Sequence, residues 1–237
     1  MNSGFETLLY LKEGGIAWVV LNRPKAFNAY NVRMRDELYQ VLYAIRDDPD
    51  VGVVVFRGEG RAFCAGADLT EFLTAPAPTT ARRARWERDV WGLLLGLPQP
   101  LIAALHGYVL GSGMEIALCC DLRLAAQGTR LGLPEVGLGI IPAAGGTQTL
   151  PRTALPRCKA LEMLFNGDLI DANEALHLGL VGRVVPPENL LDEAKAMARH
   201  LLDMPHGIAT RVKQSVHRGL DMSLRKGLEL EREMGWL

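Results

Sequence analysis

Two glutamates lie where a carboxylate has few polar neighbours along the chain. Glu115 follows Met114 and precedes the apolar run 116–120, and Glu135 lies between the sequences LGLP and VGLG. Burial among such neighbours disfavours the charged form and makes a carboxyl group a better general acid or base. Two isolated acids can divide the acid and base roles of one reaction. The alternative for Glu115 is a charge that only complements a helix dipole.

A glycine-rich turn leads directly to the first of these acids. Residues 106–115 read HGYVLGSGME and pass from a strand through glycines into a helix. Glycine lets the backbone approach a ligand closely, and the first N–H groups of a helix lie at the positive end of its dipole. We therefore expect an oxyanion to bind near Ser112. The alternative is a tight turn into a core helix.

A second loop follows a strand that is expected to be buried. The segment 59–68 is rich in glycine and alanine, and residues 62–69 read AFCAGADL. The preceding run 51–56 is apolar without alternation, which is typical of a strand covered on both faces. The two loops are the parts of the sequence that favour a reactive site.

The elements that must position these loops alternate between strands and helices. One helix carries an apolar stripe made by Met34, Leu38, Val41, Leu42 and Ile45. The pattern predicts strands at 5–11, 16–21, 51–56, 101–105, 122–125 and 130–133, and helices at 31–47, 79–95 and 112–120. From Gly145 it predicts helices alone, ending with 190–202, 207–220 and 223–234. Such alternation favours an α/β layered core.

The composition describes an ordinary globular chain. The 237 residues suit one domain, or one domain with a short appendage. The formal net charge of -1 argues against nucleic acid or an anionic membrane as partner. The N-terminus lacks the pattern of a secretory signal, and the broken apolar run 93–105 is too short to span a bilayer.

Several other residue types that can carry chemistry are expected to have plain structural roles here. The histidines lack metal-ligand spacing, and the cysteines (Cys64, Cys119, Cys120 and Cys158) are expected to be small buried side chains. The arginines Arg82, Arg83, Arg85 and Arg88 are expected to form a solvated helix face, with phosphate binding as the alternative. The partial glycine pattern at 111–113 lacks the continuation of a dinucleotide-binding motif.

Together these segments resemble the crotonase superfamily, and within it the enoyl-CoA hydratase/isomerase family. The stretches that carry the resemblance are LNRPKAFNA (21–29), AFCAGADL (62–69), HGYVLGSGMEIALCCDLRLAA (106–126), GLPEVGLGIIPAAGGTQTLPR (132–152) and DANEALHLGLVGRVV (171–185). The match is collinear over nearly the whole chain. It implies an α/β fold, a crotonase-like spiral of ββα units, with a core over 1–186 that holds the CoA and acyl site. A C-terminal helical trimerisation region is implied over 187–237, shorter than is usual for the family.

The resemblance also implies roles for individual residues. The catalytic pair would be Glu115 and Glu135, and the oxyanion hole would use the backbone N–H groups of Ala67 and Ser112. Residues expected at the CoA and substrate site are Lys25, Ala26, Ala65, Gly66, Asp68, Leu69, Thr70 and Gly111. Ser112 stands where the family commonly has glycine, which is tolerable because the backbone donates. Thr70 replaces a basic residue of some relatives, which argues against a phosphate contact there.

The function implied by this resemblance is syn addition of water to a 2-enoyl-CoA thioester. The alternatives within the family are an enoyl-CoA isomerase or a CoA-thioester hydrolase, and a different class is a non-catalytic CoA- or RNA-binding protein. No metal and no cofactor besides the CoA of the substrate are expected. The expected partners are further copies of the chain in a homotrimer or hexamer, with no nucleic acid and no membrane. The expected location is the cytoplasm.

Overall fold

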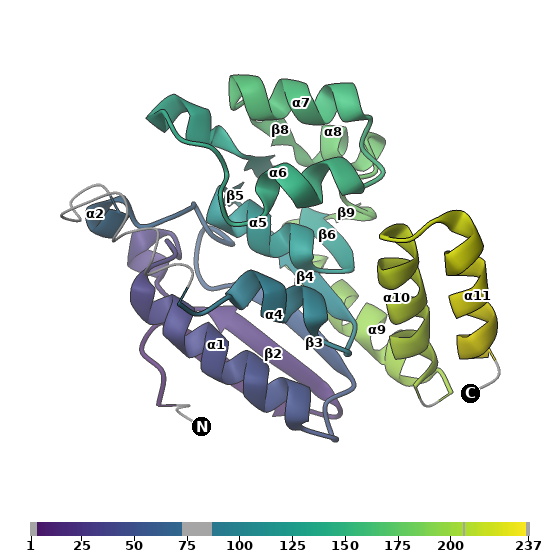
Figure 1. Ribbon diagram of the computed structural model, residues 1–237. Helices are drawn as coiled ribbons and strands as arrows, with labels where there is room; N and C mark the ends of the chain where they lie inside the picture. The colour runs from purple at the N-terminus through teal and green to yellow at the C-terminus, as the bar shows by residue number, and fades with distance from the viewer. Residues whose placement is uncertain (1–3, 73–86, 206, 236–237) are drawn as a thin grey trace.

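The computed structural model describes residues 4–72, 87–205 and 207–235. Strands and helices alternate along most of the chain and pack as layers, with the C-terminal helices beside the sheet (Figure 1). The α/β class expected from the sequence is confirmed.

The larger sheet of the described residues has six strands in the order β1-β2-β3-β4-β6-β9. Their bounds are β1 Leu8–Glu13, β2 Ile16–Leu21, β3 Val53–Gly58, β4 Leu101–Leu105, β6 Leu122–Ala126 and β9 Arg183–Val185. The first two strands form an antiparallel hairpin, and the remaining neighbours are parallel. The carboxyl ends of β3 and β4 therefore lie at one edge, where the two glycine-containing loops begin.

The central strands are buried on both faces, as the apolar run at 51–56 predicted. Along β3, Val54 and Phe56 join the hydrophobic cluster that includes α1, while Val53 and Val55 join a cluster under α9. Because side chains alternate across a strand, an uninterrupted apolar run supplies both clusters at once. This double burial holds the edge that carries the loops in a fixed place.

The helix α1 (Val32–Asp47) covers one face of this sheet with the predicted apolar stripe, which is buried throughout. Asn31 caps it, because its side-chain oxygen accepts a hydrogen bond from the Met34 N–H at 2.9 Å. The neighbouring helix α4 (Val90–Gly96) is capped in the same way by Asp89. Of the helix predicted over 79–95, the part from Val90 is confirmed, the prediction is wrong for 87–89, which precede the helix, and 79–86 lies outside the described residues.

A smaller sheet of the described residues contains the strand that leads into the glycine turn before α5 (Ser112–Cys119). It contains β5 (Tyr108–Leu110), β7 (Arg130–Gly132) and β8 (Ile170–Asp171) in that order. The sequence pattern did not predict β5, and it assigned helices alone after Gly145, which is wrong for β8 and β9. Strands of two or three residues are too short for alternation to reveal, so tertiary pairing defines them.

The remaining helices complete the layers around the two sheets. They are η1 Pro24–Ala26, α2 Leu69–Phe72, α5 Ser112–Cys119, η2 Pro134–Leu138, α6 Gly146–Thr149, η3 Leu150–Arg152, α7 Arg157–Asn166, α8 Ala172–His177, η4 Pro187–Asn189, α9 Leu190–Leu202, α10 Ile208–Leu220 and α11 Leu224–Gly235. The predicted C-terminal helices agree with α9, α10 and α11 to within one residue at each end. Helix α9 packs on the sheet, whereas α10 and α11 form a hairpin beside it (Figure 1).

The hairpin is joined to the core by a cluster of polar side chains. Lys213 of α10 is buried, and its Nζ lies 2.9 Å from an Asp121 carboxylate oxygen and donates to the Gln99 carbonyl, also at 2.9 Å. His217 lies 3.0 Å from the second Asp121 oxygen. The Lys213 and His217 partners hold the pKa of Asp121 below its usual value, against the opposing effect of burial. Asp121 directly follows Cys120 at the end of α5, and it therefore links α10 to that end of α5.

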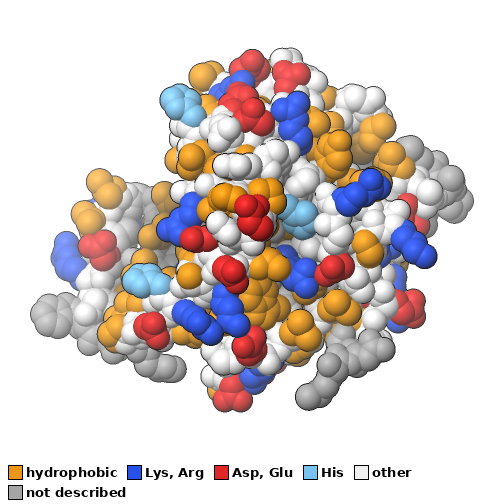
Figure 2. Space-filling model, turned by 180° about the vertical axis from the view of Figure 1, so that it is seen from behind, with side chains coloured by type: hydrophobic (Ala, Val, Ile, Leu, Met, Phe, Trp, Pro, Cys, Tyr) orange, Lys and Arg blue, Asp and Glu red, His pale blue; other side chains and the backbone are white. Residues whose placement is uncertain are grey.

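Acidic and basic side chains are interspersed over the face in Figure 2, in keeping with the net charge of -1. No helix in the described ranges is long and apolar enough to cross a membrane.

Cys64, Cys119 and Cys120 are buried, and burial raises the pKa of the Cys64 thiol to about 11. The expectation of a buried Cys158 was wrong, because this residue is exposed at the second position of α7.

Candidate active site

The helix α5, which carries Glu115, begins at a glycine corner. Gly111 has φ 50° and ψ -120°, a conformation that a side chain disfavours. Its N–H donates to the Gly132 carbonyl at 3.0 Å, and its carbonyl accepts from the Glu115 N–H at 2.8 Å. Ser112 is the first residue of α5 and is 1% exposed. Its N–H therefore lies at the positive end of the helix dipole.

The two loops singled out in the sequence meet at their glycines. A Cβ on Gly111 would lie 3.5 Å from the Gly66 Cα and 2.9 Å from the Glu135 Oε1. Gly66 itself has φ 110°, and a Cβ on it would lie 3.5 Å from the Leu110 carbonyl oxygen. The first loop, the turn into α5 and one of the predicted acids are therefore in contact at one point.

The backbone pairing around Ala67 fixes the direction of its N–H. The Tyr30 N–H donates to the Gly66 carbonyl, and the Asp68 N–H donates to the Tyr30 carbonyl, each at 2.8 Å. Along an extended segment the N–H groups alternate between sides, so the Ala67 N–H points away from Tyr30. Gly66, directly before Ala67, contacts Gly111, directly before Ser112, since a Cβ on Gly111 would lie 3.5 Å from the Gly66 Cα. The expected oxyanion-hole donors thus belong to segments that contact each other.

Glu115 is buried and held by backbone donors. It is 1% exposed, and its Oε1 accepts hydrogen bonds from the N–H groups of Ala144 at 2.8 Å and Gly146 at 3.1 Å. A Cβ on Gly146 would lie 3.2 Å from the same oxygen. The carboxylate is therefore fixed in orientation by the loop before α6.

These backbone donors were not predicted from the sequence as part of the site. The sequence feature that indicates these donors is the glycine pair Gly145-Gly146, which follows Pro142 and two alanines. Gly145 has φ 112°, which only glycine adopts without strain, and it turns the chain so that the neighbouring N–H groups face Glu115.

Glu135 lies at the other side of this contact. It is in the first turn of η2, directly after Pro134, and is half-buried. Through Gly111 it is joined to the start of α5, which also carries Glu115. The structure therefore brings the two predicted acids to the same glycine corner from different elements.

The segment expected to contact CoA borders the first loop. Lys25 and Ala26 lie in η1, and the Ala65 N–H donates to the Phe27 carbonyl at 3.0 Å. Asn28 is fully buried with φ 57°, and its side-chain amide donates to the Ala62 carbonyl at 2.7 Å. Asn28 therefore joins the segment of Lys25 to the start of the loop AFCAGADL.

The polar residues at the end of that loop are largely engaged with each other. Asp68 accepts from the Thr70 hydroxyl at 2.6 Å and forms an ion pair with Arg23 at 2.9 Å. These partners, Thr70 first, hold the pKa of Asp68 below its usual value. Leu69, the first residue of α2, is 44% exposed and free to meet a ligand.

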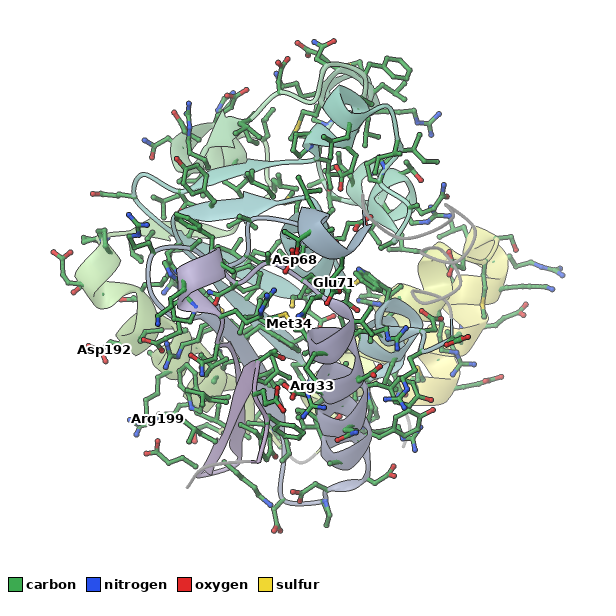
Figure 3. All side chains as sticks on the ribbon, turned by 90° about the vertical axis from the view of Figure 1, so that its left-hand side faces the viewer. Arg33, Met34, Asp68, Glu71, Asp192 and Arg199 are labelled. Atoms are coloured by element: carbon green, nitrogen blue, oxygen red, sulfur yellow. The ribbon has the colours of Figure 1, made fainter. Side chains whose placement is uncertain are left out.

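The short helix α2 is anchored to α1 by an acid. Glu71 accepts a hydrogen bond from the Val32 N–H at 2.9 Å. Figure 3 shows Asp68 and Glu71 near the end of α1 that carries Arg33 and Met34. The loop that carries Ala67 and Asp68 is thus fixed at both ends.

A glycine corner at a helix start that contacts a second loop, with the Glu135 carboxylate beside it and Glu115 in the first turn of the helix, defines a site that can stabilise an oxyanion and move protons. A model of the enoyl-CoA hydratase/isomerase family matches residues 11–235 of the chain. The chain belongs to this family, and the resemblance drawn from its sequence motifs is confirmed.

The relatives and solved structures cover nearly all of the chain. A probable enoyl-CoA hydratase of Mycobacterium bovis is 39% identical over 232 residues, 97% of this chain and 88% of the relative. A crotonyl-CoA hydratase of Syntrophomonas wolfei is 36% identical over 230 residues, with the same coverage of 97% and 88%. The crystal structure of an enoyl-CoA hydratase from Bacillus anthracis superposes with a TM-score of 0.92 at 35% identity, covering 97% of this chain and 89% of that one. The crotonase-like fold with C-terminal helices is confirmed.

Proposed function

We propose that this protein is an enoyl-CoA hydratase that adds water across the C2–C3 double bond of a 2-enoyl-CoA thioester. The observation that carries the proposal is the glycine corner at the start of α5, with the Glu135 carboxylate beside Gly111 and the buried, oriented carboxylate of Glu115 in the first turn of the same helix. The names of relatives that are 36–39% identical, hydratases of enoyl- and crotonyl-CoA, support the same reaction.

The thioester oxygen would lie between the N–H groups of Ala67 and Ser112. Addition of the water oxygen to C3 moves the double-bond electrons toward the carbonyl and forms an enolate. Both N–H groups would stabilise its oxygen, and each such donor contributes about 3–4 kcal/mol in a transition state. The dipole of α5 adds to this effect because its positive end is at Ser112.

The two carboxylates would divide the proton transfers. Glu135 would take a proton from the attacking water and return one to C2, and Glu115 would orient the water. The Glu115 oxygen that accepts from Ala144 and Gly146 is fixed, so the other oxygen can face the water. Addition of O–H and H from one side gives syn stereochemistry. The CoA moiety arrives with the substrate, and no further cofactor enters the proposed reaction.

The test is the loss of absorbance of crotonyl-CoA at its conjugated thioester band. We expect turnover by the wild type and a fall of about 10²–10⁴-fold in kcat for Glu115→Gln and for Glu135→Gln, because each removes a positioned acid–base group. Glu188→Gln is the matched control, since Glu188 is exposed in η4. Wild-type turnover that survives both active-site variants would refute the assigned roles.

Product analysis separates the alternatives within the family. A hydratase yields a hydroxyacyl-CoA, an isomerase a shifted alkene and a thioester hydrolase free CoA. The pair of acids favours hydration, because moving a double bond requires only one group that shuttles a proton. Tight acyl-CoA or RNA binding without turnover of any enoyl-CoA would favour the non-catalytic alternative instead.

We also propose that the chain assembles as a homotrimer or a hexamer and acts in the cytoplasm. The supporting feature is the hairpin of α10 and α11, which carries exposed apolar side chains although it packs on the core through a charged cluster. Light scattering on the purified protein tests the assembly.

A further inference from the structure

A pocket of about 480 Å³ lies between α4 and the loop before α6. This volume falls in the range of about 300–1,000 Å³ that is typical of small-molecule sites. Trp91 and Leu95 of α4 form one wall, and Ala143, Ala144 and Gly145 form the other. The described residues that line it are apolar apart from the Trp91 indole nitrogen, the carboxylate of Asp89 and the backbone.

The pocket adjoins the candidate site at two points. Ala144 lines the pocket, and its own N–H holds the Glu115 carboxylate at 2.8 Å. The Trp91 ring packs edge-on against Tyr30 with the ring centroids 5.1 Å apart, and the backbone of Tyr30 pairs with the segment of Ala67. Trp91 therefore lies between the oxyanion loop and the loop that fixes Glu115, where the acyl chain of a bound thioester would pass.

The indole nitrogen of Trp91 is a donor that has no acceptor among the described residues. Trp91 is 7% exposed, and its Nε1 is buried and makes no hydrogen bond with any described residue. Trp91 lines the pocket, and its Cδ1, the ring atom bonded to this nitrogen, would lie 3.9 Å from a Cβ on Gly145, another lining residue. Buried polar groups are normally satisfied, so an unsatisfied donor beside a pocket points to an acceptor on the ligand.

The charge of the pocket limits what that acceptor can be. Asp89 caps α4 through the Gly92 N–H at 2.8 Å and lines the same pocket. A second carboxylate brought beside it would be disfavoured by repulsion between like charges. The fitting ligand group is therefore a neutral oxygen, such as a hydroxyl or keto group, on an otherwise apolar chain.

We infer that Trp91 is a specificity-determining residue that selects acyl groups with a neutral hydrogen-bond acceptor a few carbons beyond the reacting double bond. This inference rests on the proposed hydratase function and names its substrate class. A purely hydrocarbon chain fills the pocket but leaves the indole N–H unpaired, and a site built around a donor disfavours a ligand that lacks the acceptor.

The test compares two substrates of equal size, 6-hydroxyhex-2-enoyl-CoA and hept-2-enoyl-CoA. The wild type is expected to favour the hydroxylated substrate in kcat/KM. In Trp91→Phe, which keeps an aromatic ring and removes the donor, the ratio of the two kcat/KM values is expected to fall by about tenfold, the effect of one buried hydrogen bond. Because the readout is a ratio, a general loss of activity cancels.

Trp18→Phe is the matched control, because Trp18 packs under α9 on the opposite face of the sheet. It is expected to keep the wild-type ratio. A second variant, Asp89→Asn, keeps a capping side chain and removes the charge. It should raise the relative kcat/KM for hex-2-enedioyl-CoA, which ends in a carboxylate.

The outcomes separate this inference from the proposed function. Hydration of both substrates with no preference in the wild type, or with the same ratio in Trp91→Phe, would overturn the role of Trp91 and leave the hydratase intact. Absence of hydration for every enoyl-CoA would instead overturn the proposed function.

Discussion

The site depends on glycines because backbone atoms must come together where a side chain would separate them. Gly66 and Gly111 both have positive φ, and a Cβ on Gly111 would lie 3.5 Å from the Gly66 Cα. The same Cβ would lie 2.9 Å from the Glu135 Oε1, closer than side-chain atoms normally approach. At the residue scale, the absence of a side chain on Gly111 lets the loop of Gly66 and the carboxylate of Glu135 meet at the start of α5.

Gly111→Ala is therefore expected to reduce kcat for crotonyl-CoA by at least about 100-fold, the effect of losing one oxyanion donor. The added methyl group must displace Glu135 or shift the start of α5. Steady-state kinetics alongside circular dichroism check the expectation. Gly128→Ala is the control, since Gly128 also has positive φ (81°) but a Cβ there meets nothing within 4 Å. Equal activity in the two variants would contradict the argument.

At the scale of elements, the helix α5 that carries Glu115 is fixed at both ends. Gly111 sets its start, and the guanidinium of Arg123 donates to the carbonyls of Ala117 and Cys120 at its end. The same side chain donates to the Leu180 carbonyl at 2.7 Å, which joins α5 to the segment before β9. A cation at the C-terminus also complements the helix dipole. These contacts fix the position of Glu115 within α5.

The cluster of Asp121, Lys213 and His217 connects α5 to the C-terminal hairpin, and it makes the stability of the protein depend on pH. Lys213 and Asp121 are nearly buried, with side-chain exposures of 7% and 15%. Removal of one partner of a buried ion pair typically costs about 3–5 kcal/mol, because the other charge is left unpaired. We therefore expect Asp121→Asn to lower the free energy of unfolding by that order near pH 7.

The sign of the pH effect follows from the lowered pKa of Asp121. A carboxyl group whose pKa is lower in the folded state contributes stability above its unfolded pKa of about 3.9 and loses it as the pH falls through the folded value. The difference between wild type and Asp121→Asn should therefore be full at neutral pH and shrink below about pH 4. Urea unfolding at several pH values measures it, and a constant difference down to pH 2 would contradict the ion pair.

At the scale of the whole molecule, the hairpin presents apolar side chains to its surroundings. Val212, Val216 and Leu220 follow one another at helical spacing on α10 and are 59%, 52% and 72% exposed. Leu224 on α11 is 79% exposed. A stripe of this kind is typical of a surface that another subunit covers.

If this stripe holds the proposed trimer together, Val216→Asp is expected to shift the protein to a smaller species in light scattering, because it buries a charge in an apolar interface. Arg218→Glu is the control, since Arg218 lies on the same helix but points away from the stripe. An unchanged mass for Val216→Asp would assign the interface to another surface.

Many of the helices and strands of this protein could be predicted from the sequence alone. The stripe of α1, the strands around Val53–Gly58 and Leu101–Leu105 and the final helices could be predicted, because periodic burial leaves a local pattern. The motifs around Glu115 and Glu135 predicted the family as well, since their order along the chain is specific.

The way the site is assembled follows from the tertiary fold. The short strands β5, β8 and β9 exist because of pairing with distant segments, and no local pattern marks them. Likewise, the donors of Ala144 and Gly146, the contact of Gly66 with Gly111 and the unpaired indole of Trp91 depend on chain segments far apart in sequence. Residue types along a chain specify which groups can do chemistry, whereas the distances between those groups are set by the packing of the whole core.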